Sequence, residues 1–179
     1  SDVVFITTND DAILTVINGI KENCEIKEGQ IFIHTSGSIS AEVFKPLEDL
    51  GALGISIHPL QTIANPQEGI KNIIGSLFAI DGNEKAFEFA KQVVDDLEGE
   101  PFFIESEKKP LYHLSAVIAC NYFVTLMNKS VNLFKKVNID EKIGTEGLIK
   151  LVKGTLNNIE RLGTEMALTG PISRGDIST

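Results

Sequence analysis

Residues 31–58, IFIHTSGSISAEVFKPLEDLGALGISIH, decide the fold, because they contain a strand, a helix and a second strand in succession. Ile31–His34 and Leu53–His58 are short apolar runs rich in β-branched residues, which are typical of strands. Between them, apolar side chains recur at helical spacing, with Ser40 as the predicted N-cap and Gly51 at the helix end. Two strands joined through a helix run parallel, so this stretch predicts a parallel sheet.

The same alternation extends in both directions over the first hundred residues. Further strands are predicted at Val3–Thr7, Leu77–Asp81 and Pro101–Ile104, and further helices after an Asn9 or Asp10 cap and over Ala86–Leu97. We therefore expect an α/β fold, in which a mainly parallel sheet with helices on its faces is followed by an all-α C-terminal domain.

The pattern changes at the polar run Ser106–Pro110, after which every apolar repeat is helical. One long helix is predicted from about Pro110 to Val137 and a second from about Glu146 to Leu168. Their apolar residues lie alternately four and three apart, which is typical of antiparallel helices shared between subunits. The predicted domains are residues 1–106, which contain the mainly parallel sheet, and residues 107–179, a truncated all-α domain.

Both ends of the sequence look cut. A buried-type strand begins at Val3, and Asp176 resembles a helix N-cap with Thr179 at its third helical position. We expect an internal piece of a longer protein, and the alternative is a compact natural domain with unusual ends.

The composition excludes several classes of protein. The 179 residues include 16 Lys and Arg against 25 Asp and Glu, a net charge of −9, which argues against nucleic acid and acidic membranes as partners. The chain opens without a secretory signal, and we expect a cytoplasmic protein. Cys24 and Cys120 lie far apart, so we expect two reduced, buried thiols.

The segment Leu111–Asn128 has no formal charge and is just long enough to span a membrane. It also contains His113, Ser115 and Asn121, and it continues into a polar helix. We interpret it as a helix buried at a subunit or domain interface rather than in a lipid bilayer.

Polar residues follow three of the predicted strands. They are Thr7-Thr8-Asn9-Asp10, His34-Thr35-Ser36-Gly37 and His58-Pro59-Leu60-Gln61-Thr62. Each alone is typical of an ordinary turn, but parallel sheets bind ligands at the carboxyl ends of their strands. Three such ends in succession favour a ligand cleft. The histidines lack the close spacing of metal ligands, and we predict no metal site.

Three further residues are candidates outside the sheet. His113 and Asn121 are polar residues of the long apolar helix, about 12 Å apart along its axis, and could line successive parts of one cleft. A satisfied core histidine is the alternative for His113. Arg174 lies in a tight Gly-Pro loop and suits a carboxylate or phosphate, or else an ion pair with Asp176.

Several of these motifs together resemble one family. They are His58-Pro59-Leu60-Gln61-Thr62, Leu111-Tyr112-His113, Asn121-Tyr122, Leu168-Thr169-Gly170-Pro171-Ile172 and Arg174-Gly175-Asp176. The sequence is similar to the Rossmann-like plus DUF2520 proteins, which are related to pyrroline-5-carboxylate reductase, ketopantoate reductase and the 6-phosphogluconate and β-hydroxyacid dehydrogenases. The resemblance implies that residues 1–106 form a partial Rossmann-type dinucleotide-binding domain and that residues 107–179 resemble the all-α C-terminal domain of 6-phosphogluconate dehydrogenase. It also implies NADP or NAD as cofactor, a small-molecule substrate and a homodimer formed through the helical domain.

The resemblance also implies roles for individual residues. Thr7, Asn9, Ser36 and Gly37 would lie along the ribose and nicotinamide side of the cofactor. His58 and Gln61 would lie near the substrate, with Arg174 as its anion clamp.

Relatives use a Lys followed by an Asn early in the first long helix for catalysis. Here His113 occupies a comparable region, preceded by Lys108 and Lys109, and the candidate catalytic residues are His113 and Asn121.

The family's glycine-rich loop, G-x-G-x-x-G, does not occur in this sequence. We therefore expect this polypeptide alone to bind NADP weakly or not at all. The leading hypothesis is a fragment of an oxidoreductase that transfers hydride between a nicotinamide cofactor and a small anionic substrate. The alternatives are a non-catalytic nucleotide- or metabolite-binding module and a dimerisation unit of Rossmann ancestry.

Overall fold

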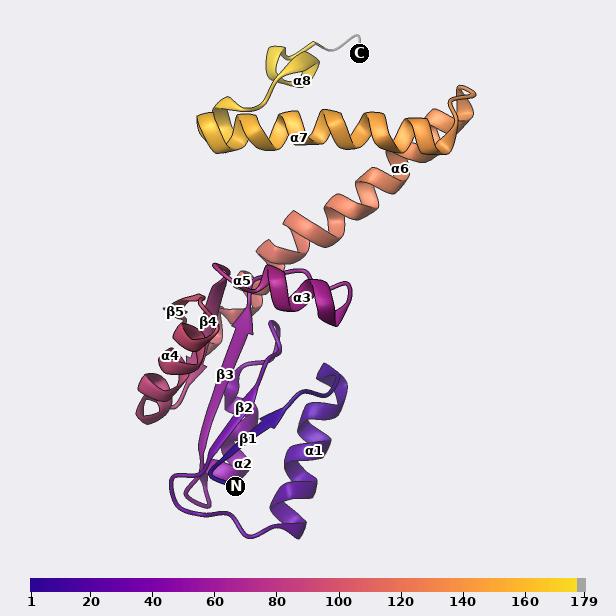
Figure 1. Cartoon of the computed structure of the whole chain (residues 1–179). Coiled ribbons are helices and arrows are strands. Elements are labelled where there is room, and N and C mark those ends of the chain that lie inside the picture. Colours follow the sequence, from indigo (N-terminus) through magenta and orange to yellow (C-terminus); the bar gives the residue numbers. More distant parts are fainter. Residues whose placement is uncertain (177–179) are drawn as a thin grey trace. The chain divides into compact units, whose positions relative to one another are not determined.

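The computed structural model describes residues 1–176 and divides into two compact units, Ser1–Cys120 and the helical part from Asn121 onward (Figure 1). The polar run Ser106–Pro110 falls inside the first unit. The helix cap that the sequence suggests at Asp176 depends on residues 177–179, which lie outside the described residues.

The first unit is built on one five-stranded sheet. Its strands are β1 (Val3–Ile6), β2 (Ile31–His34), β3 (Leu53–Pro59), β4 (Leu77–Gly82) and β5 (Glu100–Phe103), in the spatial order β1-β2-β3-β4-β5. All neighbouring strands are parallel except β3 and β4, which are antiparallel. The predicted α/β fold with a mainly parallel sheet is thus confirmed.

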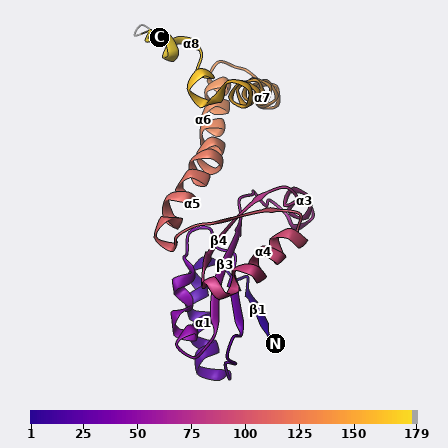
Figure 2. The ribbon, with the colours of Figure 1, turned by 90° about the vertical axis from the view of Figure 1, so that its left-hand side faces the viewer.

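Helices cover both faces of this sheet. The helices of the unit are α1 (Asp10–Asn23), α2 (Lys45–Glu48), α3 (Pro66–Asn72), α4 (Phe87–Asp96) and α5 (Lys109–Val117), with short 3₁₀ turns at Ala41–Phe44, Glu84–Ala86 and Ser106–Lys108. Helices α1 and α4 lie on opposite sides of the strands (Figure 2). Helix α3 has no counterpart in the sequence-based prediction.

Each face has its own apolar core. Ile13 and Ile17 of α1 pack with Phe32 of β2 on one face, and Ala90 and Val94 of α4 pack with strand residues of β2 to β4 on the other. These side chains are almost fully buried, and their burial stabilises the unit.

Two predicted helix caps are wrong in detail. Asn9 and Ser40 do occupy N-cap positions, but neither side chain accepts the capping hydrogen bond. The helix predicted after Ser40 also begins as a 3₁₀ turn and only then becomes α2.

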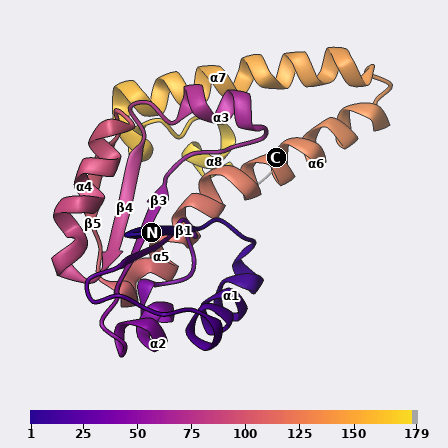
Figure 3. The same cartoon turned by 60° about the horizontal axis from the view of Figure 1, so that its bottom comes forward.

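Helix α5 continues through a π-helical turn, Ile118–Tyr122, into α6 (Phe123–Lys136). A tight turn then leads to α7 (Glu141–Met166), and α8 (Gly170–Arg174) follows (Figure 3). Helix α7 begins five residues before the predicted start, because Asp140 accepts hydrogen bonds from the amides of Lys142 and Ile143. Near its end, Gly163 has a φ of 78°, which interrupts the helical backbone.

The cysteine prediction is wrong on burial. Cys24 and Cys120 are free, as expected, but both are exposed, because they lie at the end of α1 and within the π-helical turn.

The helical stretch Ser106–Lys136 is the one described segment long and apolar enough to cross a membrane, judged by length and composition alone. Its most apolar window is not buried within the single chain, so its burial at a subunit or domain interface stays a prediction. The stretch also includes Lys109, which is buried in an ion pair with the sheet. This ion pair fixes the beginning of the helix to strand β4 of the sheet.

Candidate functional site

Polar residues interrupt one face of the sheet. His34 of β2 lies opposite Ser56 of β3, and Ser56 lies opposite Asp81 of β4. Because strand side chains alternate between faces, His58 shares this face with them. The same face meets α1 and α2, so the polar residues lie beside its apolar core.

The loop after β2 is tied to the beginning of α1. The carboxylate of Asp10 accepts hydrogen bonds from the hydroxyls of Ser36, at 2.8 Å, and Ser38, at 2.9 Å. The amide of Ser36 also donates to Nδ1 of His34 at 3.2 Å. The carboxyl ends of β1 and β2 therefore meet, as the sequence predicts.

Gly37 lies against two imidazole rings. A Cβ atom at this position would come within 2.5 Å of His113 Nδ1 and 2.6 Å of His58 Nε2. The rings of His58 and His113 meet edge to face, with centroids 6.0 Å apart. Nδ1 of His58 is hydrogen-bonded to the hydroxyl of Tyr112 at 2.8 Å. We call Gly37, His58, Tyr112 and His113 the histidine cluster.

The cluster contains a polar atom with unused hydrogen-bonding capacity. Nδ1 of His113 is buried and has no hydrogen-bond partner among residues 1–176. A buried polar atom left unpaired is costly, and such atoms in native proteins often mark a binding or catalytic role. The alternative of a satisfied core histidine is therefore not what the structure shows.

Burial sets the protonation of the cluster near neutral pH. Burial, and then the positive charge of Lys109, lower the pKa of His58 to about 4. The same two causes lower the pKa of His34 to about 4. Burial raises the pKa of the Tyr112 hydroxyl to about 12. His58 is therefore neutral at pH 7 and Tyr112 keeps its proton.

The two lysines before His113 have different environments. Lys108 is exposed and pairs with Glu105 at 2.9 Å. Lys109 is completely buried, and its ammonium group donates hydrogen bonds to Ser56 and to Asp81. Both charges of the Lys109–Asp81 pair are inaccessible to solvent, so the lysine is engaged before any ligand is present.

The structure brings four of the candidate residues to this sheet edge. Ser36, Gly37, His58 and His113 are joined by the contacts described above. Thr7 and Asn9 follow β1 and are exposed, and their side chains form no hydrogen bond with the cluster among residues 1–176.

The other candidates have different partners. The amide of Gln61 donates to the Asn72 carbonyl at 2.8 Å and so fixes the end of α3. Asn121 is exposed in the π-helical turn, within the second unit. Arg174, in α8, forms an ion pair with Asp176 at 2.8 Å, the alternative that the sequence left open.

Sequence reasoning did not single out Tyr112, Ser38 or the Lys109–Asp81 pair as members of the site. A signal for Asp81 existed, because a carboxylate at the end of the apolar run LFAID is unusual in a buried strand. Nothing local in the sequence indicates that its partner is Lys109, 28 residues later.

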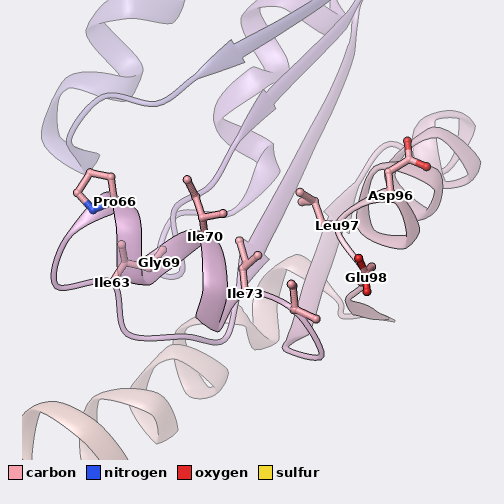
Figure 4. Close-up of a pocket in the computed structure, with 9 residues that line it drawn as sticks. Ile63, Pro66, Gly69, Ile70, Ile73, Asp96, Leu97 and Glu98 are labelled. Atoms are coloured by element: carbon pink, nitrogen blue, oxygen red, sulfur yellow. The ribbon is translucent and has the colours of Figure 1, made fainter.

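A separate apolar cavity of about 450 Å³ lies between α3 and the end of α4 (Figure 4). Ile63, Ile70 and Ile73 line it, with Asp96 and Glu98 at the other side. None of the residues that line this cavity belongs to the histidine cluster, so the cavity is not part of the candidate site.

Two protein families match the sequence. Residues 1–59 match a Rossmann-like domain, and residues 76–179 match DUF2520, a domain of unknown function. No functionally curated protein is similar enough to count as a match.

Several solved structures have the same fold. The protein TM1727 of Thermotoga maritima is 34% identical, with a TM-score of 0.79 over 99% of this chain. A provisionally assigned NADP oxidoreductase of Bacteroides fragilis is 22% identical, with a TM-score of 0.76 over 99% of this chain. The NADP-bound pyrroline carboxylate reductase of Plasmodium falciparum is 14% identical, with a TM-score of 0.61 over 94% of this chain.

The chain spans 66%, 65% and 65% of the length of these three proteins, respectively. At 22% and 14% identity the latter two establish the shared fold alone.

Proposed function

Because the chain belongs to the DUF2520 family and shares its fold with NADP-dependent oxidoreductases, we propose that it forms part of such an enzyme. The reaction is a hydride transfer between a nicotinamide cofactor and a small anionic substrate. The observation that supports this proposal is the buried Nδ1 of His113, which has no hydrogen-bond partner among residues 1–176 and lies against Gly37 at the carboxyl edge of the parallel strands β1 to β3.

The residues at this edge fit the ribose and nicotinamide end of a dinucleotide. Gly37 has no side chain where the two imidazoles approach, and Ser36, Ser38 and Asp10 supply hydroxyl and carboxylate groups for sugar hydroxyls. A carboxylate repels phosphate, so Asp10 does not suit the pyrophosphate. When bound, the nicotinamide supplies or accepts the hydride.

His113 holds the proton that the reaction needs at the substrate. Its Nδ1 can accept or donate a hydrogen bond, depending on the tautomer, and no protein group competes for it among the described residues. His58 is neutral and bonded to Tyr112, so it orients the cluster without adding charge.

His113→Ala in the whole protein tests the proposal, with the exposed Ser115→Ala on the same helix as control. The assay follows NADPH consumption with a cyclic imine carboxylate and a 2-oxo acid. We expect the parent protein to consume NADPH with one of them, and His113→Ala to lower kcat by about 10²–10⁴-fold with NADPH affinity retained. NADPH binding without turnover would favour a non-catalytic binding module instead.

The second unit supports a further part of the proposal, a homodimer formed through α6 and α7. A groove of about 540 Å³ between these helices is lined mainly by apolar residues, among them Phe123, Met127 and Leu156. Leu151 is 65% exposed and Met166 is 74% exposed. Large apolar side chains in such numbers on a two-helix unit favour coverage by a second copy.

Sedimentation velocity with Leu151→Asp, and with the exposed Lys150→Asp as control, tests this dimer. We expect the parent and the control to sediment as dimers and Leu151→Asp as a monomer. A monomeric parent protein would show that another surface covers these helices.

A further inference from the structure

Both sides of the histidine cluster are fixed to one buried carboxylate. Oδ2 of Asp81 accepts hydrogen bonds from the Ala41 amide, at 2.8 Å, and from the Ser106 hydroxyl, at 3.1 Å. Oδ1 of the same carboxylate pairs with Lys109 at 2.6 Å. Ala41 ends the loop that contains Gly37, and Lys109 begins α5.

Lys109 connects this carboxylate to the cluster along α5. Residues three and four positions later in a helix lie on the same side, and these are Tyr112 and His113. Lys109 also donates to Ser56 in the middle of β3, two residues before His58. The lysine therefore joins the helix that holds two cluster residues to the strand that holds a third.

We propose that the buried Lys109–Asp81 pair is a positioning pair, which aligns the Gly37 loop and α5 across the sheet and places a fixed positive charge behind His58. Neither residue contacts substrate, because both are inaccessible to solvent. Any effect of this pair on the reaction rests on the proposed function. The alignment of the Gly37 loop with α5 and the effect of the Lys109 charge on His58 do not.

The charge of Lys109 is one of a small number of titratable groups that act on His58. His113 and Tyr112 face it from α5, His34 from β2, and Asp10 from α1. Burial contributes most to its lowered pKa, Lys109 comes second, and Asp10 opposes them. Removing the lysine charge therefore raises the pKa of His58, while burial still holds it below the ordinary value of 6.5.

The test is an NMR titration of the histidine rings, which needs no substrate and no turnover. The sequence has only 3 histidines, so each signal can be assigned from one substitution. The variants are Lys109→Met, the double variant K109M/D81N and, as control, Lys108→Met. Lys108 has the same charge one residue earlier, but it is exposed and pairs with Glu105.

The double variant keeps an acceptor oxygen for the Ala41 amide while it removes both buried charges, so folding is expected to survive. We expect the pKa of His58 to rise in Lys109→Met and in the double variant, and to stay at about 4 in Lys108→Met.

Amide exchange over residues 36–41 and 109–113 reports alignment of the two sides. We expect it to accelerate at least about tenfold in Lys109→Met and to change little in Lys108→Met. An unchanged His58 pKa in Lys109→Met and the double variant would overturn the proposal. So would failure of the double variant to fold. If the alignment is confirmed but the whole protein shows no NADPH turnover, only the proposed function fails.

Discussion

The two units of the chain differ in how fully they bury their apolar side chains and pair their polar ones. Ser1–Cys120 has an apolar core on each sheet face and joins its buried polar groups into a network around Asp81. From Asn121 onward, two long helices bury few residues, such as Val131 and Leu148, and expose many apolar ones. The first unit therefore buries both an apolar core and a polar network, whereas the described part of the second unit leaves many of its large apolar side chains exposed.

Charge separates the two units in the same way. Ser1–Cys120 contains 19 acidic and 8 basic side chains, and the remainder contains 6 acidic and 8 basic ones. The sheet unit therefore carries a net charge of −11 and the remainder of the chain one of +2, which together give the net charge of −9. The helical unit is free of the strong self-repulsion that would oppose pairing with a second copy.

The largest expected effect is on the buried ion pair. Asp81→Ala removes the partner of Lys109 and the acceptor of the Ala41 amide, so we expect a loss of about 3–5 kcal/mol in the free energy of unfolding. Urea unfolding of the chain measures it. Lys91→Ala, which breaks an exposed ion pair at 2.8 Å, is the control and should cost less than about 1 kcal/mol. Equal losses in the two variants would contradict the difference between buried and exposed pairs.

The next effect is a loss of stability in acid. His34 and His58 have folded pKa values of about 4 against 6.5 when unfolded, so between these values the unfolded chain binds more protons. Stability is complete above pH 6.5 and falls as the pH falls toward 4, by at most about 1.4 kcal/mol per pH unit for each histidine.

Urea unfolding at pH 5 and pH 7 measures this loss. His58→Gln should remove about half of it, and an identical pH dependence in that variant would show that His58 titrates normally.

A smaller effect is expected at Gly37. In Gly37→Ala the new Cβ would meet both imidazoles, so we expect a cost of about 1–3 kcal/mol and displacement of the His113 ring. Thermal unfolding and the histidine NMR signals report the two effects. Gly19→Ala in α1, where a Cβ meets nothing, is the matched control and should stabilise the chain by up to about 1 kcal/mol. A tolerated Gly37→Ala with unmoved histidine signals would place the imidazoles elsewhere.

The smallest effect is in the second unit. Gly154 of α7 has open space for a Cβ, so Gly154→Ala should raise stability by about 0.5–1 kcal/mol. Thermal unfolding in dilute solution measures the gain. Destabilisation would indicate that another surface closely covers this part of α7.

Much of the sheet could be predicted from the sequence, because strand and helix periods are local. Ile31–His34 is predicted to the residue, and the other strands differ by one residue at their ends. The antiparallel pairing of β3 and β4 could not be predicted, because it depends on how the chain returns through α3. Helix α3 did have a signal, Asn65-Pro66 with Glu68, and Asn65 does accept the capping hydrogen bond.

The site was predictable only where it follows the strand ends. That rule predicts Ser36, Gly37 and His58 as site residues. His113 is predicted because it is a polar residue in an apolar helix. Tyr112 and the Lys109–Asp81 pair depend on tertiary packing, since their partners lie 54 and 28 residues away in the sequence.

The most direct test of the proposed site is a titration of NADPH into the whole protein while the three histidine rings are observed by NMR. The signals of His113 and His58 should move on binding, because both rings lie against Gly37. His34, which is fully buried and bonded to Ser36, should move least. Binding of NADPH that leaves His113 and His58 unchanged would contradict a nicotinamide site at the histidine cluster.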